Sequence, residues 1–330
     1  MVRARPTIPS KGMPPPVNGL HHITAIAGDP QENLDFYAGV LGMRLVKRSV
    51  NQDDPSTYHL FYADAVGHPG ADLTFFPWTM AAPPRMGHGL AVEVSLEIPR
   101  DSVEFWSARL ERYGVVHDSD VRFGERAITL HDPHGMAVAL VEPSVMPARA
   151  FTPWDDGPVG AAQQIRGLHG ARVWQREAAP SIDFLTRVMG LELLAAEGEW
   201  QRFGARGGAG TIDVRETPNE RRGAWGIGAV HHLAWRVDDD IHQQAVRTAV
   251  VESGARPTGV IDRFWFRSVY FREPGGVLFE LATDGPGFTV DEDTGHLGES
   301  LVLPPFLESM RPTIEQQLPT LVMPGVSGVR

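Results

Sequence analysis

The sequence contains no cysteine, which excludes disulfides, thiolate metal ligands and cysteine nucleophiles together. Basic residues are outnumbered by acidic ones: the chain has 30 Lys and Arg and 41 Asp and Glu, which gives a formal net charge of −11. That balance argues against nucleic acid or an anionic membrane as a partner. No apolar run approaches the ~20 residues of a membrane-spanning helix, and residues 1–16 lack the apolar stretch of a secretory signal. We therefore expect a cytoplasmic globular protein.

Internal repeats dominate what the sequence does contain. A constant shift places the segment that starts GLH (19–21) onto GLH (167–169), and VLGM (40–43) onto VMGL (188–191). A second pair of units begins with HGLA (88–91) and HHLA (231–234). Each unit reads as a strand, an amphipathic helix and further strands, with glycine closing the helix. The sequence predicts an α+β fold of four βαβββ modules in tandem, paired into two open β-barrel-like domains.

The composition along the chain predicts where these domains begin and end. Segments dense in Pro, Ala and Gly are typical of linkers. The predicted division is a flexible N-terminal segment at 1–18, a domain of modules 1 and 2 at 19–145, a linker at 146–165, a domain of modules 3 and 4 at 166–287, and an extended strap with a short final helix at 288–330.

Two His-His doublets and one glutamate lie in apolar strands. The doublets occur in GLHHITAI (19–26) and AVHHLAW (229–235), and the glutamate in GVLFELA (276–282). A carboxylate among such neighbours is costly to bury unless something compensates its charge. Two imidazoles and a carboxylate that converge would bind a divalent metal, and such a set is typical of non-haem Fe(II) oxygenases. We predict His22, His232 and Glu280 as the ligands.

The repeats also show which residues the fold itself does not require. At the position of His22, modules 2 and 3 carry Gly89 and Gly170, and at the position of Glu280 module 1 carries Phe75. For the three predicted ligands to meet, modules 1 and 4 must share one cavity, which leaves modules 2 and 3 metal-free.

The preceding histidines, His21 and His231, recur in all four modules, so they have either a structural role or a role in proton transfer beside the metal. Since successive strand residues face opposite sides, His21 faces away from the cavity unless the strand bulges, whereas Thr24 shares the face of His22. The histidines at 59, 68, 117, 242 and 296 are expected to be solvated.

The motifs GLHHIT (19–24), VHHLA (230–234) and DRFWFRSVYFREPGG (262–276) resemble the vicinal oxygen chelate superfamily, and within it the hydroquinone ring-cleaving dioxygenases. The resemblance implies Fe(II), with Mn(II) as the alternative, at positions matching the three predicted ligands. It implies O₂ insertion into a dihydroxylated aromatic, most simply a substituted hydroquinone, in aromatic compound degradation. It also implies catalytic roles for the positions that match His21, Thr24, His231, Arg263 and Tyr270.

Several alternatives stay open at this point. Arg263 orients an anionic oxygen or forms a structural ion pair, as its module 2 equivalent Arg122 would. The protein could be an extradiol catechol dioxygenase or a non-catalytic ligand-binding protein. It could also be a glyoxalase I-like isomerase, whose fourth metal ligand would come from the position of Phe75. The expected partners are a small aromatic molecule and O₂, and self-association is left open.

Overall fold

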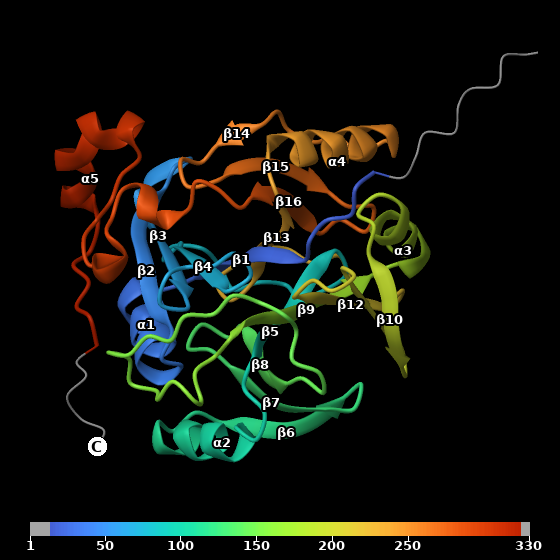
Figure 1. Ribbon diagram of the computed structural model, residues 1–330, viewed down its shortest axis with the longest axis horizontal. Coiled ribbons are helices and arrows are strands. Elements are labelled where there is room, and N and C mark those ends of the chain that lie inside the picture. The colour runs from blue at the N-terminus through green and yellow to red at the C-terminus, as the bar shows by residue number, and fades with distance from the viewer. Residues whose placement is uncertain (1–13, 325–330) are drawn as a thin grey trace, which may run out of the picture.

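The structure is a computed structural model that describes residues 14–324. Its sixteen strands form two curled eight-stranded sheets (Figure 1). Modules 1 and 2 comprise β1 (Leu20–Ala27), α1 (Pro30–Leu34) with a π-helical turn (Asp35–Val40), β2 (Arg44–Asn51), β3 (Asp54–Ala63) and β4 (Asp72–Pro77), then β5 (Leu90–Glu97), α2 (Val103–Arg112), β6 (His117–Arg122), β7 (Glu125–His131) and β8 (Ala137–Glu142).

The second half repeats the same order. Modules 3 and 4 comprise β9 (Gly167–Gln175), α3 (Ala178–Arg187), β10 (Glu192–Glu197), β11 (Trp200–Gly204) and β12 (Thr211–Glu216), then β13 (Val230–Val237), α4 (Asp240–Glu252), β14 (Ile261–Asp262), β15 (Arg267–Arg272) and β16 (Leu278–Thr283). The predicted tandem of βαβββ modules is therefore confirmed.

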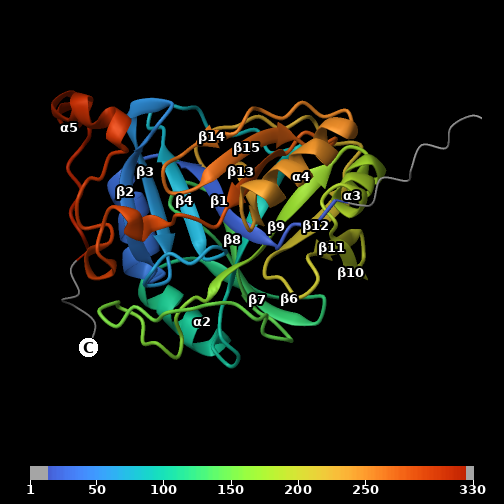
Figure 2. The ribbon, with the colours of Figure 1, turned by 45° about the horizontal axis from the view of Figure 1, so that its top comes forward.

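The sheets combine modules in an order that the chain does not follow. The first sheet runs β14-β15-β16-β13-β1-β4-β3-β2 and joins module 4 to module 1, while the second runs β10-β11-β12-β9-β5-β8-β7-β6 and joins module 3 to module 2 (Figure 2). This order brings modules 1 and 4 together, as the predicted sharing of one cavity requires. The pairing of modules 1 with 2 and 3 with 4 is wrong, because the first strands of modules join as β1 with β13 and β5 with β9.

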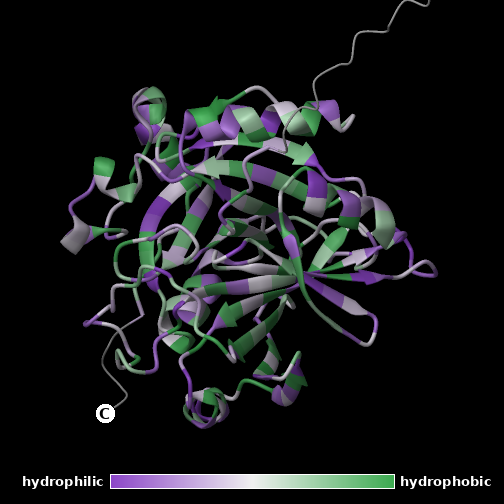
Figure 3. Cartoon of the chain, turned by 45° about the vertical axis from the view of Figure 1, so that its right-hand side comes forward, coloured by the Kyte–Doolittle hydropathy of each residue, from purple (hydrophilic) through white to green (hydrophobic). Residues whose placement is uncertain are grey.

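The helices cover the outside of the sheets through amphipathic faces. Gln243, Val246 and Val250 on α4 recur at the helical spacing and are buried. The carboxylate of Asp239 caps the same helix by accepting the backbone N–H groups of Ile241 and His242. In Figure 3, hydrophobic and hydrophilic colours alternate along the helix at the top.

The C-terminal strap packs on module 1. It forms short 3-10 turns at Phe288–Val290, Thr294–His296 and Pro305–Met310, followed by α5 (Arg311–Gln317). The ammonium group of the buried Lys47 on β2 donates to Oδ1 of Asp291 at 2.7 Å and also pairs with Glu292. Val50, Leu303, Leu307 and Ile314 form an apolar cluster between the strap and the sheet. The strap is thus held to the first sheet by a buried charge and by apolar contacts.

Specific contacts hold residues in two further predicted segments. Of the segment predicted as flexible, residues 1–13 lie outside the described residues, but Val17 is buried and its N–H donates to the carbonyl of Met189. The predicted linker has no regular strand or helix, yet the side chain of Gln164 is buried and bonded to the carbonyls of Trp154 and Val159. Within residues 14–324, none of the helices has the length and apolar character needed to cross a bilayer.

Candidate metal centre

Each histidine doublet lies at a β-bulge between β1 and β13. The antiparallel register shifts by one residue at His21 and again at His231, so two residues of one strand oppose one of the other. Nδ1 of His21 lies 2.9 Å from Nδ1 of His22, and Nδ1 of His231 lies 2.8 Å from Nδ1 of His232. The bulges therefore bring both members of each doublet together, whereas regular strands would place them on opposite faces.

The side chains of His22, His232 and Glu280, hereafter the triad, converge from three adjacent strands. Nε2 of His22 lies 3.2 Å from Nε2 of His232 and 3.2 Å from Oε2 of Glu280, and the distance from Nε2 of His232 to Oε2 is 2.9 Å. All three side chains are buried. Among residues 14–324 this is the one cluster of His, Asp and Glu groups whose geometry could hold a metal ion.

The surroundings of the triad fit a divalent cation. Oε1 of Glu280 accepts the hydroxyl of Ser268, but Oε2 has no hydrogen-bond donor and faces the two imidazoles. Burial raises the pKa of Glu280, but the adjacent imidazoles outweigh this effect and hold its pKa well below the usual range. The neighbouring histidines engage Nδ1 of each triad imidazole, so that Nε2 faces the other triad members. Two imidazole nitrogens and one carboxylate oxygen form a donor set that would hold a divalent metal and leave other coordination positions open.

The histidines that precede the triad members occupy different environments. His21 is buried, and its burial together with the neighbouring His22 lowers its pKa to about 3. The ring of His231 stacks on Trp225 with centroids 4.4 Å apart, and the Trp78 ring lies perpendicular to it at 5.6 Å. The structure thus places both residues beside the triad, as predicted, but His231 lies in an aromatic cage that the sequence did not indicate.

Arg263 and Tyr270 line the same cavity as the triad histidines. The guanidinium of Arg263 forms two hydrogen bonds to the carboxylate of Asp53, at 3.1 and 2.8 Å, and lies over the Tyr270 ring. The ring of Tyr270 approaches that of His232, and burial and the charge of Glu280 raise the pKa of the Tyr270 phenol. The ion pair weighed for Arg263 therefore exists, and it also holds the guanidinium at the cavity.

The cavity is narrow and largely aromatic. Its free volume is about 30 Å³, enough for a few water molecules, whereas a cavity that binds benzene is about 150 Å³. Hence an aromatic ring could enter only if lining side chains move. The ring of Phe266, one of these lining side chains, lies 5.1 Å from the His22 ring. The lining residues are His22, Asn51, Gln52, Asp53, His59, Phe61, Phe76, His232, Arg263, Trp265, Phe266 and Tyr270.

The residue related to Glu280 by the symmetry of the first sheet is Thr74. Thr24 pairs with Thr74 on β4 in the same way that Ala234 pairs with Glu280 on β16. Between β1 and β13, Thr24 pairs with His232 and His22 pairs with Ala234. An approximate two-fold axis between these strands therefore exchanges module 1 with module 4. The prediction of Phe75 for this position is wrong by one residue. That step matters because it moves the side chain to the other face of the sheet, where Phe75 joins the apolar core.

Thr24 is fully buried on this side of the site, and its hydroxyl lies 2.8 Å from that of Thr74. His59, which the sequence led us to expect in solvent, also lies here: its Nε2 is 2.9 Å from Oγ1 of Thr74, and its ring lines the cavity. The sequence did contain a signal for His59, because it lies two residues from Phe61 and therefore on the same face of a strand. A single histidine on a strand is nevertheless weak evidence for function.

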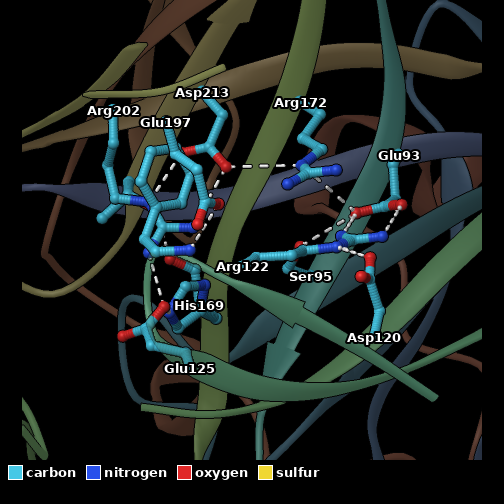
Figure 4. Close-up of polar contacts among 12 residues, drawn as sticks. Glu93, Ser95, Asp120, Arg122, Glu125, His169, Arg172, Glu197, Arg202 and Asp213 are labelled. Atoms are coloured by element: carbon cyan, nitrogen blue, oxygen red, sulfur yellow. Dashed lines mark hydrogen bonds and ion pairs between the residues drawn. The ribbon is translucent and has the colours of Figure 1, made fainter. Parts of the chain in front are cut away.

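The second sheet carries charged side chains where the first sheet carries the triad (Figure 4). The same two bulges occur between β5 and β9, and the register makes Glu93 the equivalent of His22, rather than Gly89 as the sequence comparison suggested. Nε of Arg172 lies 4.0 Å from Glu93 and 3.4 Å from Asp213, which is the equivalent of Glu280. A guanidinium thus supplies positive charge between these carboxylates, and the prediction of a metal-free second sheet agrees with this arrangement.

Arg202→Ala is expected to lower the free energy of unfolding by about 3 kcal/mol. Its buried guanidinium pairs with Asp213 at 2.7 Å and with Glu125 at 2.5 Å, so its removal leaves two buried carboxylates without this partner. Urea denaturation measures the loss. The control is Arg206→Ala, because Arg206 is exposed in its pair with Glu192 and should change stability by less than ~1 kcal/mol. Equal losses in the two variants would contradict the structural role of the buried network.

Comparison with known proteins relates this architecture to enzymes of one superfamily. Residues 19–140 and 167–281 match the family model of the Glyoxalase/Bleomycin resistance protein/Dioxygenase superfamily. The chain is 44% identical to the "Putative ring-cleaving dioxygenase MhqO" of Bacillus subtilis, over 91% of this chain and 95% of that protein. It is 33% identical to the chlorohydroquinone/hydroquinone 1,2-dioxygenase of Sphingobium indicum, over 91% of this chain and 95% of that enzyme.

Solved structures agree with this relationship. A crystal structure described as a putative dioxygenase from Bacillus subtilis superposes with a TM-score of 0.88 at 42% identity, and the match covers 94% of this chain and 99% of that one. Glyoxalase I from Zea mays shares the fold, with a TM-score of 0.60 at 15% identity over 81% of this chain and 92% of that one. The family model matches most of the described residues, and the similarity to the relatives extends over nearly their full lengths. This chain therefore belongs to the Glyoxalase/Bleomycin resistance protein/Dioxygenase superfamily.

Proposed function

We propose that the protein is a ring-cleaving dioxygenase in which His22, His232 and Glu280 hold Fe(II), with Mn(II) as the alternative. The observation that carries this proposal is the buried convergence of two imidazole nitrogens and one carboxylate oxygen, all within 4.8 Å of one another. Thr74 lies at the position from which a fourth protein ligand, a second carboxylate, would complete the site. Its hydroxyl is instead engaged by Thr24 and His59. A three-ligand set leaves room for both an organic substrate and O₂.

A dihydroxylated aromatic, most simply a hydroquinone, is the substrate class that the lining of the cavity favours. Phe61, Phe76, Trp265 and Phe266 provide flat apolar walls against which a ring can pack. The relative from Sphingobium indicum is named for chlorohydroquinone and hydroquinone. When bound, the metal acts as a Lewis acid toward a substrate hydroxyl and as the redox centre between the ring and O₂.

The chain's own groups bind and orient the reactants. The pKa of Tyr270 is raised by burial and by Glu280, so its phenol stays protonated at neutral pH and donates a hydrogen bond to a substrate oxygen. The guanidinium of Arg263, held by Asp53, offers positive charge to an anionic oxygen. His21 and His231 are neutral at pH 7, because burial lowers both pKa values to about 3. Each therefore has one donor and one acceptor ring nitrogen, and the acceptor is the Nδ1 that faces the triad imidazole, which leaves Nε2–H as a donor.

Oxygen uptake with a panel of substrates tests the proposal. Protein loaded with Fe(II) under anaerobic conditions and then mixed with air is expected to consume one O₂ per substituted hydroquinone cleaved. Catechols test the extradiol alternative, and a hemithioacetal tests the isomerase. Isomerisation of the hemithioacetal without oxygen uptake on any phenol would contradict the dioxygenase. Tight binding of a phenol without turnover would instead support a ligand-binding protein. The cytoplasmic location and self-association remain predictions.

A further inference from the structure

His59 projects from β3 into the cavity, where its ring packs against aromatic neighbours. The centroid of its ring lies 3.8 Å from that of Phe61 and 4.4 Å from that of Phe76. Tyr270 lines the same cavity from β15, which lies on the other side of the central β13–β1 pair. A ring bound between these two walls would therefore meet a polar group at each side.

One nitrogen of His59 is already committed. Its Nε2 lies 2.9 Å from Oγ1 of Thr74, and that hydroxyl lies 2.8 Å from Oγ1 of Thr24. Both threonines are fully buried. The two-fold relation of the first sheet gives this contact an equivalent in module 4, where Ser268 donates to Glu280. His59 thus occupies the position of a residue that orients a metal ligand, but it orients a hydroxyl pair instead.

The other nitrogen, Nδ1, makes no hydrogen bond with any residue in 14–324, although the ring is partly exposed in the cavity. Burial, together with the nearby imidazoles of His22 and His232, holds the pKa of His59 well below its ordinary value, so the ring is neutral. A neutral imidazole has one donor and one acceptor nitrogen. An unpaired Nδ1 at a cavity wall is therefore a specific hydrogen-bonding group for a ligand.

We infer that His59 binds the aromatic substrate through Nδ1 and that it pairs with the hydroxyl that the metal does not take. This inference rests on the proposed function. In a catechol the two hydroxyls are adjacent and can both reach one ion, whereas the second hydroxyl of a hydroquinone lies across the ring and needs a partner in the protein wall. His59, fixed by Thr74 and by two aromatic rings, supplies that partner and thereby favours hydroquinones over catechols.

Three substitutions at His59 separate its two nitrogens. The amide of His59→Asn occupies the position of Nδ1, that of His59→Gln reaches the position of Nε2, and His59→Phe keeps only the aromatic packing. Hydroquinone binding is measured by calorimetry on metal-loaded protein without O₂, so that no turnover occurs. We expect the Kd to rise about tenfold or more in His59→Gln and His59→Phe, because a substrate hydroxyl loses its partner, and to stay within about threefold in His59→Asn.

Phenol is the matched control ligand, since it lacks the second hydroxyl and should bind equally to all four proteins. Metal content and thermal midpoint should also match the wild type in each variant. If His59→Gln bound hydroquinone as tightly as the wild type, or lost as much affinity for phenol as for hydroquinone, the role of His59 would be overturned. The proposed function would not be affected by that result. A metal-loaded wild-type protein that neither binds nor oxidises hydroquinone would overturn the proposed function as well.

Discussion

Glu280→Ala is expected to abolish both metal retention and turnover. Glu280 supplies the triad's one negative charge, and its Oε2 faces both imidazole nitrogens without another hydrogen-bond donor. A metal that binds only the folded protein at ~1,000 times its Kd stabilises it by about 4 kcal/mol. The wild type should therefore gain about that much stability from Fe(II) or Mn(II), and Glu280→Ala should gain close to none. Thermal unfolding with and without metal measures the difference.

Glu97→Ala is the matched control for this variant. Glu97 is also fully buried, but it lies on β5 of the second sheet, where it pairs with Arg149 at 2.9 Å. Its removal should lower stability with and without metal by the same amount, so the gain from metal should persist. Stoichiometric metal bound to Glu280→Ala with wild-type affinity would show that Glu280 is not a ligand.

Thr74→Glu is expected to retain metal and lose oxygen uptake. The two-fold relation of the first sheet makes position 74 the equivalent of position 280, so a glutamate there presents a second carboxylate to the same ion. A fourth protein ligand occupies a coordination position that substrate or O₂ needs. Metal affinity should rise, because a second negative charge faces the cation, while oxygen uptake with hydroquinone should fall at least a hundredfold.

Two further variants at position 74 isolate the cause. Thr74→Ser keeps the hydroxyl beside Thr24 and His59 and should keep activity within a few fold. Thr74→Gln has the size of glutamate without its charge, so it tests whether bulk alone blocks the site. Should Thr74→Glu bind metal no more tightly than Thr74→Gln, the symmetry between positions 74 and 280 would not extend to coordination.

The repeated modules and the triad were predictable because they leave local signals. The recurrence of GLH at 19–21 and 167–169 marks the modules, and comparison between modules isolates His22, His232 and Glu280. The joining of modules 1 and 4 followed from one physical demand, that ligands distant in sequence must meet, and the order of the first sheet confirms it.

Register was not predictable, because it depends on hydrogen bonds between strands. A match without gaps aligned Gly89 with His22, whereas the bulges between β5 and β9 make Glu93 the equivalent. An error of one residue in the same comparison assigned Phe75 to the position of Thr74. The role of His59 escaped for a related reason, since its partners Thr74 and Phe76 come from the neighbouring strand. Contacts across strands follow from the fold and not from spacing along the chain.

The most direct test is an anomalous difference map from crystals grown with Fe(II) under anaerobic conditions. The structure predicts a single strong peak per chain, about 2.0–2.3 Å from Nε2 of His22, Nε2 of His232 and a carboxylate oxygen of Glu280. It predicts no peak among Glu93, Arg172 and Asp213 in the second sheet. A peak held by other residues, or no peak in metal-soaked crystals, would contradict the account.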